Sequence, residues 1–297
     1  MNIVLIDRNI VSDIRKYNVG NRDHDFEQAR TVDKEKNFVS PLMSIIEGRF
    51  RNPQSYAKMY DALVDEGAEI EKFYKKARTD TEFLKSNAIQ MISAFSAKAE
   101  EDVAKYSSFV KFLQKKLADP VAEERASVVQ REILDFAVDN YYYPGHPVSI
   151  CGLSCLHGNA AAHGVLKPKV YKTQEIDGAA YNSLLDILIT NQLAYIRSFQ
   201  KGSNNVTFLT RDGGLKNFLR QFKVVVNKKI SDHAADQQVI AYSADLNIDL
   251  FPNLKKQPKK YSLLIEELAI AERKSMIANP RLKSIARSIG TVGRQIP

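Results

Sequence analysis

The sequence predicts an α/β fold in which a central parallel sheet lies between layers of helices. Two short apolar segments, Ile3–Ile6 and Val206–Leu209, have the length and β-branched content of buried strands. Each segment is followed by a helical pattern, and each ends near an acid, Asp7 in the first case and Asp212 in the second. Strands that alternate with helices favour a three-layer α/β/α core.

The N-terminal 50 residues predict a strand, a helix, a loop and a second helix. Residues 3–6 form the strand, and apolar residues at helical spacing extend the chain from Asn9 to Tyr17 as a helix. Residues 18–25 are rich in turn-forming types. A second helix opens at Ser40-Pro41, because serine caps a helix and proline fits its first position, and this helix carries Glu47.

Residues 54–140 differ in composition from the rest of the chain. Glycine and proline are scarce there, and Ala, Glu, Lys, Leu and Phe recur every three or four residues. This pattern predicts four helices, at 54–77, 80–101, 103–117 and 121–140. The segment holds no chemical motif, and we interpret it as a helical module for packing or for binding a partner.

The C-terminal half returns to alternating strands and helices. A short apolar stretch at Val148–Cys151 has the composition of a strand, and a long helix is expected over Ile176–Phe199, with Asp186 on it. The remaining elements are expected, in order, as a helix at 213–221, a strand at 223–226 and a helix at 232–244 capped by Ser231. The predicted core is therefore discontinuous, with residues 1–50 and 147–250 in the core, residues 51–146 as a helical insertion, and residues 251–297 as a basic C-terminal helix and tail.

Composition and charge restrict the classes of function. No apolar run reaches the length of a membrane span, no signal-peptide pattern is present, and two cysteines cannot build a disulfide framework. We therefore expect a cytoplasmic protein that does not bind membranes. Residues 255–297 hold ten Lys/Arg against three Glu, which is most of the net charge of +8. Such a segment suits nucleic acid, and a solvated tail without a specific partner is the alternative.

Four acids stand out by their positions. Asp7 and Asp212 follow predicted strands, and the carboxyl ends of parallel strands meet at one edge of a sheet, where ligands bind. Glu47 and Asp186 interrupt apolar helix faces, where an unpaired carboxylate is costly to bury. Several carboxylates around Mg²⁺ or Mn²⁺ can activate water and stabilise charge on a phosphate. In the alternative interpretation, each acid caps a helix or pairs with an arginine.

These residues resemble those of PIN-domain nucleases. The resemblance rests on Ile6-Asp7-Arg8-Asn9 before a helix, Val39-Ser40 leading to Glu47, Asp186 on a long helix, and Phe208-Leu209-Thr210-Arg211-Asp212. It implies a PIN-like three-layer core, Mg²⁺ or Mn²⁺ held by the four acids, support from Asn9 and Thr210, and endonucleolytic hydrolysis of RNA in preference to DNA. Arg8 stands where the family usually has a small hydroxyl residue, and Arg8 or Arg211 is expected to pair with a substrate phosphate.

Two alternatives remain open at this stage. A PIN-like protein without catalysis could hold nucleic acid or a protein, using the basic segment and the helical insertion. Separately, Cys151, Cys155, His157 and His163 could in principle bind zinc, although their spacing is not a common structural pattern and the cysteines also fit as small buried apolar residues.

Overall fold

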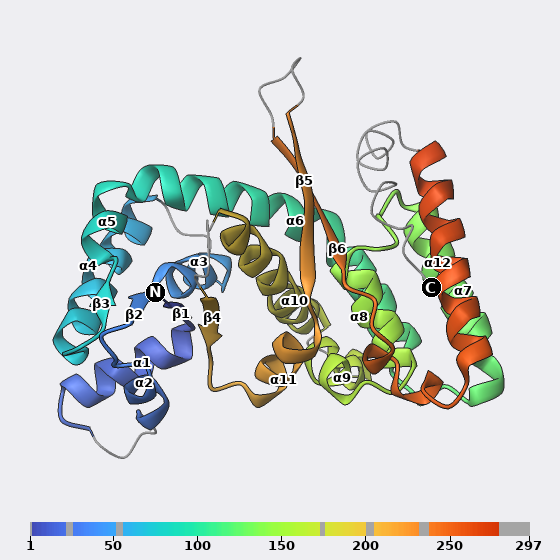
Figure 1. The fold of residues 1–297 in the computed structure, drawn as a ribbon, viewed down its shortest axis with the longest axis horizontal. Helices are drawn as coiled ribbons and strands as arrows, with labels where there is room; N and C mark the ends of the chain where they lie inside the picture. The colour runs from blue at the N-terminus through green and yellow to red at the C-terminus, as the bar shows by residue number, and fades with distance from the viewer. Residues whose placement is uncertain are drawn as a thin grey trace. The chain divides into compact units, whose positions relative to one another are not determined.

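The computed structural model describes residues 2–21, 26–51, 56–172, 176–199, 205–231 and 238–278 (Figure 1). The chain forms two compact units. Unit 1 comprises Met1–Asp102 and Tyr195–Lys216, and unit 2 comprises Val103–Ala194 and Asn217–Pro297. The predicted core of residues 1–50 and 147–250 therefore coincides with neither unit, because residues 147–194 belong to unit 2. Among the residues described, no helix has both the length and the apolar character needed to cross a bilayer.

Unit 1 is built on a four-stranded sheet in the order β3-β2-β1-β4, with all three pairings parallel. The strands are β1 (Asn2–Ile6), β2 (Asn37–Ser40), β3 (Arg78–Thr79) and β4 (Asn205–Leu209). In register, Val4 of β1 lies between Val39 of β2 and Thr207 of β4. The prediction of an α/β fold with a parallel sheet is confirmed at this level, although helices dominate the chain.

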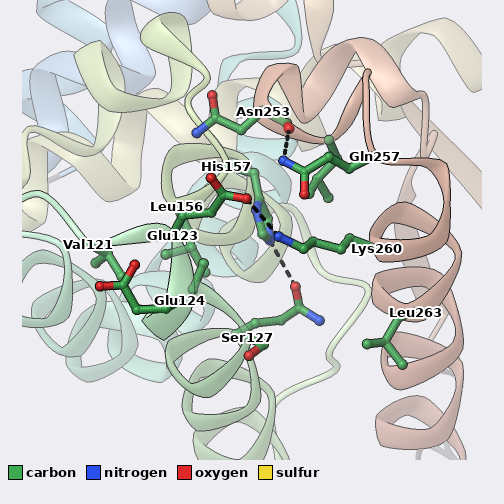
Figure 2. Close-up of a pocket in the computed structure, with 13 residues that line it drawn as sticks. Val121, Glu123, Glu124, Ser127, Leu156, His157, Asn253, Gln257, Lys260 and Leu263 are labelled. Carbon is green, nitrogen blue, oxygen red and sulfur yellow. Dashed lines mark hydrogen bonds and ion pairs between the residues drawn. The ribbon is translucent and has the colours of Figure 1, made fainter.

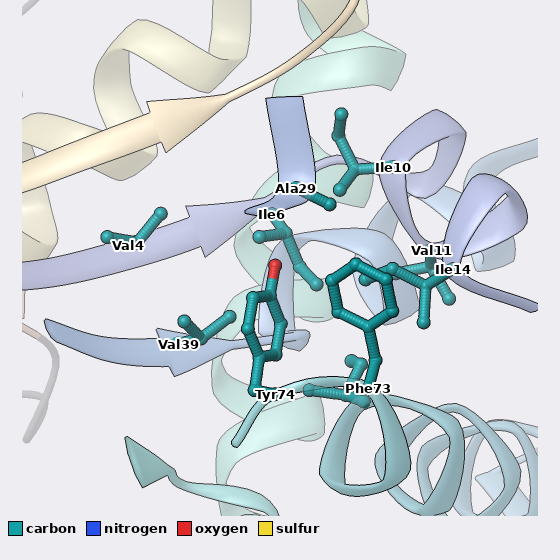
Figure 3. Close-up of a cluster of buried hydrophobic side chains, with 10 residues drawn as sticks. Val4, Ile6, Ile10, Val11, Ile14, Ala29, Val39, Phe73 and Tyr74 are labelled. Carbon is teal, nitrogen blue, oxygen red and sulfur yellow. The ribbon is translucent and has the colours of Figure 1, made fainter. Parts of the chain in front are cut away.

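Helices pack against the sheet of unit 1, and their buried side chains form one apolar cluster with those of the strands (Figure 3). Val4 and Ile6 share one face of β1 because side chains alternate along a strand, and both are buried. The other buried members come from the neighbouring elements: Ile10, Val11 and Ile14 from α1 (Arg8–Asn18), Ala29 from α2 (Glu27–Thr31), Val39 from β2, Ile70 and Phe73 from α4 (Tyr56–Phe73), and Tyr74 just after it. This cluster anchors β1, whose last residue precedes Asp7.

The remaining helices of unit 1 are α3 (Leu42–Arg51) and α5 (Thr81–Ser86), while α6 (Ala88–Lys116) begins in unit 1 and ends in unit 2. The pattern of residues 54–140 predicted helices correctly, but their bounds differ. The short α5 takes the start of the helix expected at 80–101, and α6 joins the rest of it to the helix expected at 103–117; β3 lies between the first two expected helices.

Unit 2 is mainly helical. It contains α7 (Glu123–Asp139), α8 (Pro147–Leu156), α9 (Ala160–Leu166), α12 (Pro258–Ala278), most of α10 (Ile176–Phe199), and short 3-10 turns at Pro168–Lys172, Ile248–Leu250 and Pro252–Leu254. β5 (Val224–Ser231) and β6 (Gln238–Ala244) pair with each other as an antiparallel ribbon. Nine residues of α8 are buried, and stacked rings from Phe109, Phe112 and Phe136 join α6 to α7.

Two local predictions were wrong, and a third element pairs differently from the expected parallel sheet. Val148–Cys151 is helical, because His146 caps α8 and Pro147 occupies its first position, and an apolar run buried on all sides has no strand-specific period. Of the helix expected at 232–244, residues 232–237 lie outside the described part of the chain, and Gln238–Ala244 form strand β6 instead. The strand at 223–226 exists as part of β5, but it pairs antiparallel with β6. In contrast, α10 and α11 (Gly213–Gln221) begin and end where predicted.

Candidate active site at the carboxyl edge of the sheet

The carboxyl ends of β1 and β4 bring together residues that are about 200 positions apart in the sequence. Asp7 follows β1, and its backbone N–H donates to the Leu209 carbonyl at 2.9 Å. The Thr210 hydroxyl, which follows β4, donates to Asp7 Oδ2 at 2.5 Å. Asp7 is 5 % exposed and Thr210 2 % exposed. A buried carboxylate needs such donors, because burial without them is costly.

Asn9 and Thr210 form a small hydrogen-bond network around Asp7. The Asn9 side chain donates to Asp7 Oδ2 at 2.5 Å and to Thr210 Oγ1 at 3.3 Å. Its carbonyl oxygen accepts the backbone N–H of Arg211 at 3.2 Å. Thr210 Oγ1 in turn accepts the backbone N–H of Asp212 at 3.0 Å. The structure therefore joins four of the predicted residues, Asp7, Asn9, Thr210 and Asp212, at one edge of the sheet.

Asp212 lies at the entrance to α11. Its Oδ1 accepts the backbone N–H of Leu215 at 2.8 Å, so the carboxylate caps the helix. The residue is exposed. Asp212 thus fulfils the alternative interpretation of a helix cap, and the hydrogen bonds of the described residues leave its second oxygen, Oδ2, unengaged.

The two arginines predicted to contact phosphate lie in this region with partners of their own. Arg211 Nε pairs with Asp13 Oδ2 at 3.0 Å, and Asp13 is 1 % exposed on α1. Arg8 is the first residue of α1 and is partly buried. Burial raises the pKa of Glu66 on α4, and the charges of Arg15 and Arg8 act in the opposite direction.

The other two predicted acids are placed differently. Asp186 belongs to unit 2, where its Oδ2 lies 3.2 Å from Lys167 Nζ. Lys167 follows α9 with φ of 50°, in the left-handed region. Glu47 lies on α3 as predicted, but its side chain is outside the described part of the structure.

Two acids of unit 1 with raised pKa values were missed by the sequence reasoning. Asp80 follows β3 at the same edge of the sheet; burial raises its pKa to about 7, although a hydrogen bond with Ser40 acts in the opposite direction. Within the described residues, Asp80 Oδ1 is buried without a hydrogen-bond partner. Glu66 on α4 accepts the Ser44 hydroxyl at 2.7 Å, and burial raises its pKa as well. A strand of two residues such as β3 is too short to show the alternation typical of strands, so Asp80 could not be recognised in the sequence as an acid at a strand end.

The donor set at the sheet edge suits a hard divalent cation held by few protein ligands. The described residues contain no group of three His, Cys, Asp or Glu side chains arranged to hold a metal. Mg²⁺, however, is commonly bound by one or two carboxylates, with water and substrate phosphate completing its shell. The described hydrogen bonds engage Asp7 Oδ2 and Asp212 Oδ1, so Asp7 Oδ1 and Asp212 Oδ2 are the oxygens that fit a cation.

The cysteine and histidine segment of unit 2 has features of apolar packing. Cys151 is buried on α8, and its thiol lies 3.9 Å from the Ala162 carbonyl. Burial raises the pKa of Cys155 to about 12 and that of Cys151 well above its ordinary value. Zinc binds the thiolate, so these protonated thiols behave as small apolar groups. His157 instead forms a hydrogen bond with Gln130.

Comparison with known proteins gives no family assignment. No protein-family model, curated protein or solved structure matches this chain. The chemistry of the site must therefore be inferred from its own residues.

Proposed function

We propose that unit 1 is a PIN-like metal-dependent endonuclease that hydrolyses phosphodiester bonds, with RNA preferred over DNA. One observation carries the proposal. Asp7 is a buried carboxylate at the end of a central strand, oriented by Asn9 and Thr210, with Asp212 beside it at the end of the neighbouring strand. A carboxylate held in a fixed direction by buried polar residues is typical of a preorganised ligand-binding site.

Asp7 and Asp212 would hold Mg²⁺ or Mn²⁺, and Glu47 on α3 is the third acid that we assign to the site. When bound, such an ion neutralises phosphate charge and lowers the pKa of water. The chain itself supplies orientation. Asn9 and Thr210 donate to Asp7 Oδ2, which leaves Oδ1 as the oxygen that we assign to the ion. Arg211, which precedes Asp212 in the chain and pairs with Asp13, would contribute positive charge for a substrate phosphate.

Asp186 is left out of this assignment. Its ion pair with Lys167 explains an acid on an apolar helix face without a metal, because a neighbouring cation offsets the cost of burying the charge. The proposal therefore predicts that Asp186→Asn retains cleavage, whereas a four-acid site predicts that it does not.

Cleavage of defined single-stranded RNA and DNA oligonucleotides with Mg²⁺ or Mn²⁺ tests the proposal. Asp7→Asn and Asp212→Asn should each abolish metal-stimulated cleavage. The matched control is Asp61→Asn, which changes an exposed aspartate on α4 and should leave the rate unchanged. Cleavage that survives Asp7→Asn, or equal cleavage in EDTA, would refute the site.

The second candidate function is a PIN-like binding module without catalysis. The described part of the basic segment favours this role, since Lys255, Lys256, Lys259, Arg273 and Lys274 lie on or beside α12. A binding module predicts nucleic-acid affinity that falls steeply with salt, through counterion release, and no cleavage with any metal.

A further inference from the structure

Unit 2 contains a cavity of about 490 Å³ that is remote in sequence from the acids of unit 1 (Figure 2). Its walls come from the N-terminal half of α7, the end of α8, the 3-10 turn Pro252–Leu254 and the first turns of α12. Val121, Leu156, Leu254 and Leu263 supply apolar surface, and Ser127, Gln130, His157 and Asn253 supply polar atoms. A volume of this size is typical of small-molecule sites.

The histidine in this cavity is held in one tautomer by a chain of hydrogen bonds. Glu267 Oε1 lies 3.5 Å from Arg131 Nε, and its Oε2 accepts the Gln130 amide N–H at 2.6 Å. A carboxylate only accepts, so the Gln130 carbonyl oxygen must face His157 Nε2, which lies 2.8 Å away. His157 Nε2 therefore carries the proton, and Nδ1 carries a lone pair.

His157 remains neutral at physiological pH. It is 5 % exposed, and burial together with the charge of Lys260 lowers its pKa to about 4. No hydrogen bond of the described residues reaches Nδ1, which is thus an acceptor without a donor in the wall of a cavity. A ligand N–H that donates to Nδ1 would replace water at this acceptor in the cavity wall and gain affinity.

The charges around the cavity disfavour both kinds of ion. Lys260 Nζ pairs with Glu123 at 2.7 Å, and Glu124 adds a second carboxylate to the lining. These acids repel an anion, while the ammonium of Lys260 disfavours a cation next to His157. A neutral molecule with an N–H donor and an apolar body is the best complement to the cavity.

We propose that this cavity binds a small neutral heterocycle of the nucleobase or nucleoside type, with a ring N–H or amino group donating to His157 Nδ1. The flat ring would lie against Leu156, Leu254 and Leu263, and Ser127 and Asn253 offer further polar contacts. This inference does not depend on the proposed nuclease activity.

Two substitutions at one position test the acceptor. His157→Gln places an amide nitrogen near Nε2, where it can still donate to Gln130, but provides no acceptor at Nδ1. His157→Asn places an amide oxygen near Nδ1 and gives up the contact with Gln130. Calorimetric titration of the full chain with uridine, cytidine, adenosine and guanosine should show binding of at least one nucleoside. Its affinity should fall about tenfold in His157→Gln and less in His157→Asn, since the hydrogen bond from the nucleoside is lost only in His157→Gln.

A measurement on the unmodified protein covers the case in which either variant fails to fold. In ¹⁵N spectra of histidine-labelled protein, the resonance of unprotonated His157 Nδ1 should move when the nucleoside that binds is added. Its assignment follows from the loss of that signal in His157→Phe. The matching 5′-monophosphate should bind more weakly because of Glu123 and Glu124. Absence of binding by all four nucleosides, binding that leaves Nδ1 unmoved, tighter binding of the monophosphate, or binding of glucose in place of nucleosides would each overturn the proposal.

Discussion

Replacing Thr210 with valine should loosen the sheet edge of unit 1 without changing its packing. The two side chains have nearly the same shape, so the substitution removes the hydroxyl and little else. The hydroxyl donates to Asp7 Oδ2 and accepts the backbone N–H of Asp212. A valine leaves the buried Asp7 carboxylate with Asn9 as its remaining described donor at Oδ2.

The magnitude follows from the burial of each partner. A hydrogen bond to a charged group contributes about 1.5–3 kcal/mol, and Asp7 is too buried for water to replace the donor freely. The Asp212 N–H is at an exposed residue, so water replaces its acceptor and the loss is small. We therefore expect Thr210→Val to lower the local stability of unit 1 by about 2–3 kcal/mol.

Hydrogen exchange measures this locally, which matters because a chain of two units need not unfold in one step. Protection of the β1 and β4 amides should fall by roughly 30- to 150-fold, since each tenfold change corresponds to about 1.4 kcal/mol. The control is Thr207→Val on the same strand, where an exposed hydroxyl makes a single 3.5 Å contact with Ile3 O. Equal effects of the two substitutions, or unchanged protection in Thr210→Val, would refute the reasoning.

Three further predictions concern buried groups elsewhere. Asp80 has a folded-state pKa of about 7 against 3.8 for the free side chain, so its ionisation penalises folding progressively from pH 4 to pH 7. The free energy of unfolding of Asp80→Asn should therefore exceed that of the wild type by up to roughly 3–4 kcal/mol at pH 8 and by nothing below pH 4. A difference in urea unfolding that does not change with pH would contradict this. Gly158 has φ of 87°, and a Cβ there would lie 2.5 Å from Asn253 Oδ1, so Gly158→Ala should lower the melting temperature by several degrees, whereas an unchanged value would exclude strain at this turn. Arg211→Met removes the cation that pairs with buried Asp13 and should lower the free energy of unfolding in urea by about 1–3 kcal/mol. The double variant that adds Asp13→Asn should recover part of that loss, and equal stability of the single and double variants would argue against the pair.

Elements with strong local signals were the ones that the sequence predicted well. α10 and α11 have the predicted bounds, because long amphipathic or capped segments define their own ends. β1 and β4 were predicted from short β-branched runs next to polar residues. The errors at α8 and β6 share a cause: in both segments, contacts elsewhere in unit 2 decide the structure, and local composition permits either helix or strand.

The candidate site was predictable where the sheet topology dictates it. Asp7 and Asp212 both follow strands, and a parallel pairing of those strands necessarily places their ends together. Asn9 and Thr210 were identified by resemblance, and the structure shows their hydrogen bonds to Asp7. Asp186 could not be placed in the same way, because the position of a residue on a helix depends on packing that no strand register fixes.

Asp7 and Asp80 follow strands at the same edge of the sheet but lie in different chemical environments. β2 lies between β1 and β3, and neighbouring strands are about 4.8 Å apart, so Asp80 at the end of β3 lies roughly 10 Å from Asp7 along the sheet edge. Asp7 accepts hydrogen bonds from Asn9 and Thr210, whereas burial raises the pKa of Asp80 to about 7 and keeps it largely protonated below that pH. Asp80→Asn should therefore change the pH dependence of stability and leave metal-stimulated cleavage intact, while Asp7→Asn should abolish that cleavage. Loss of cleavage in Asp80→Asn at full folding would mean that the site extends across β2.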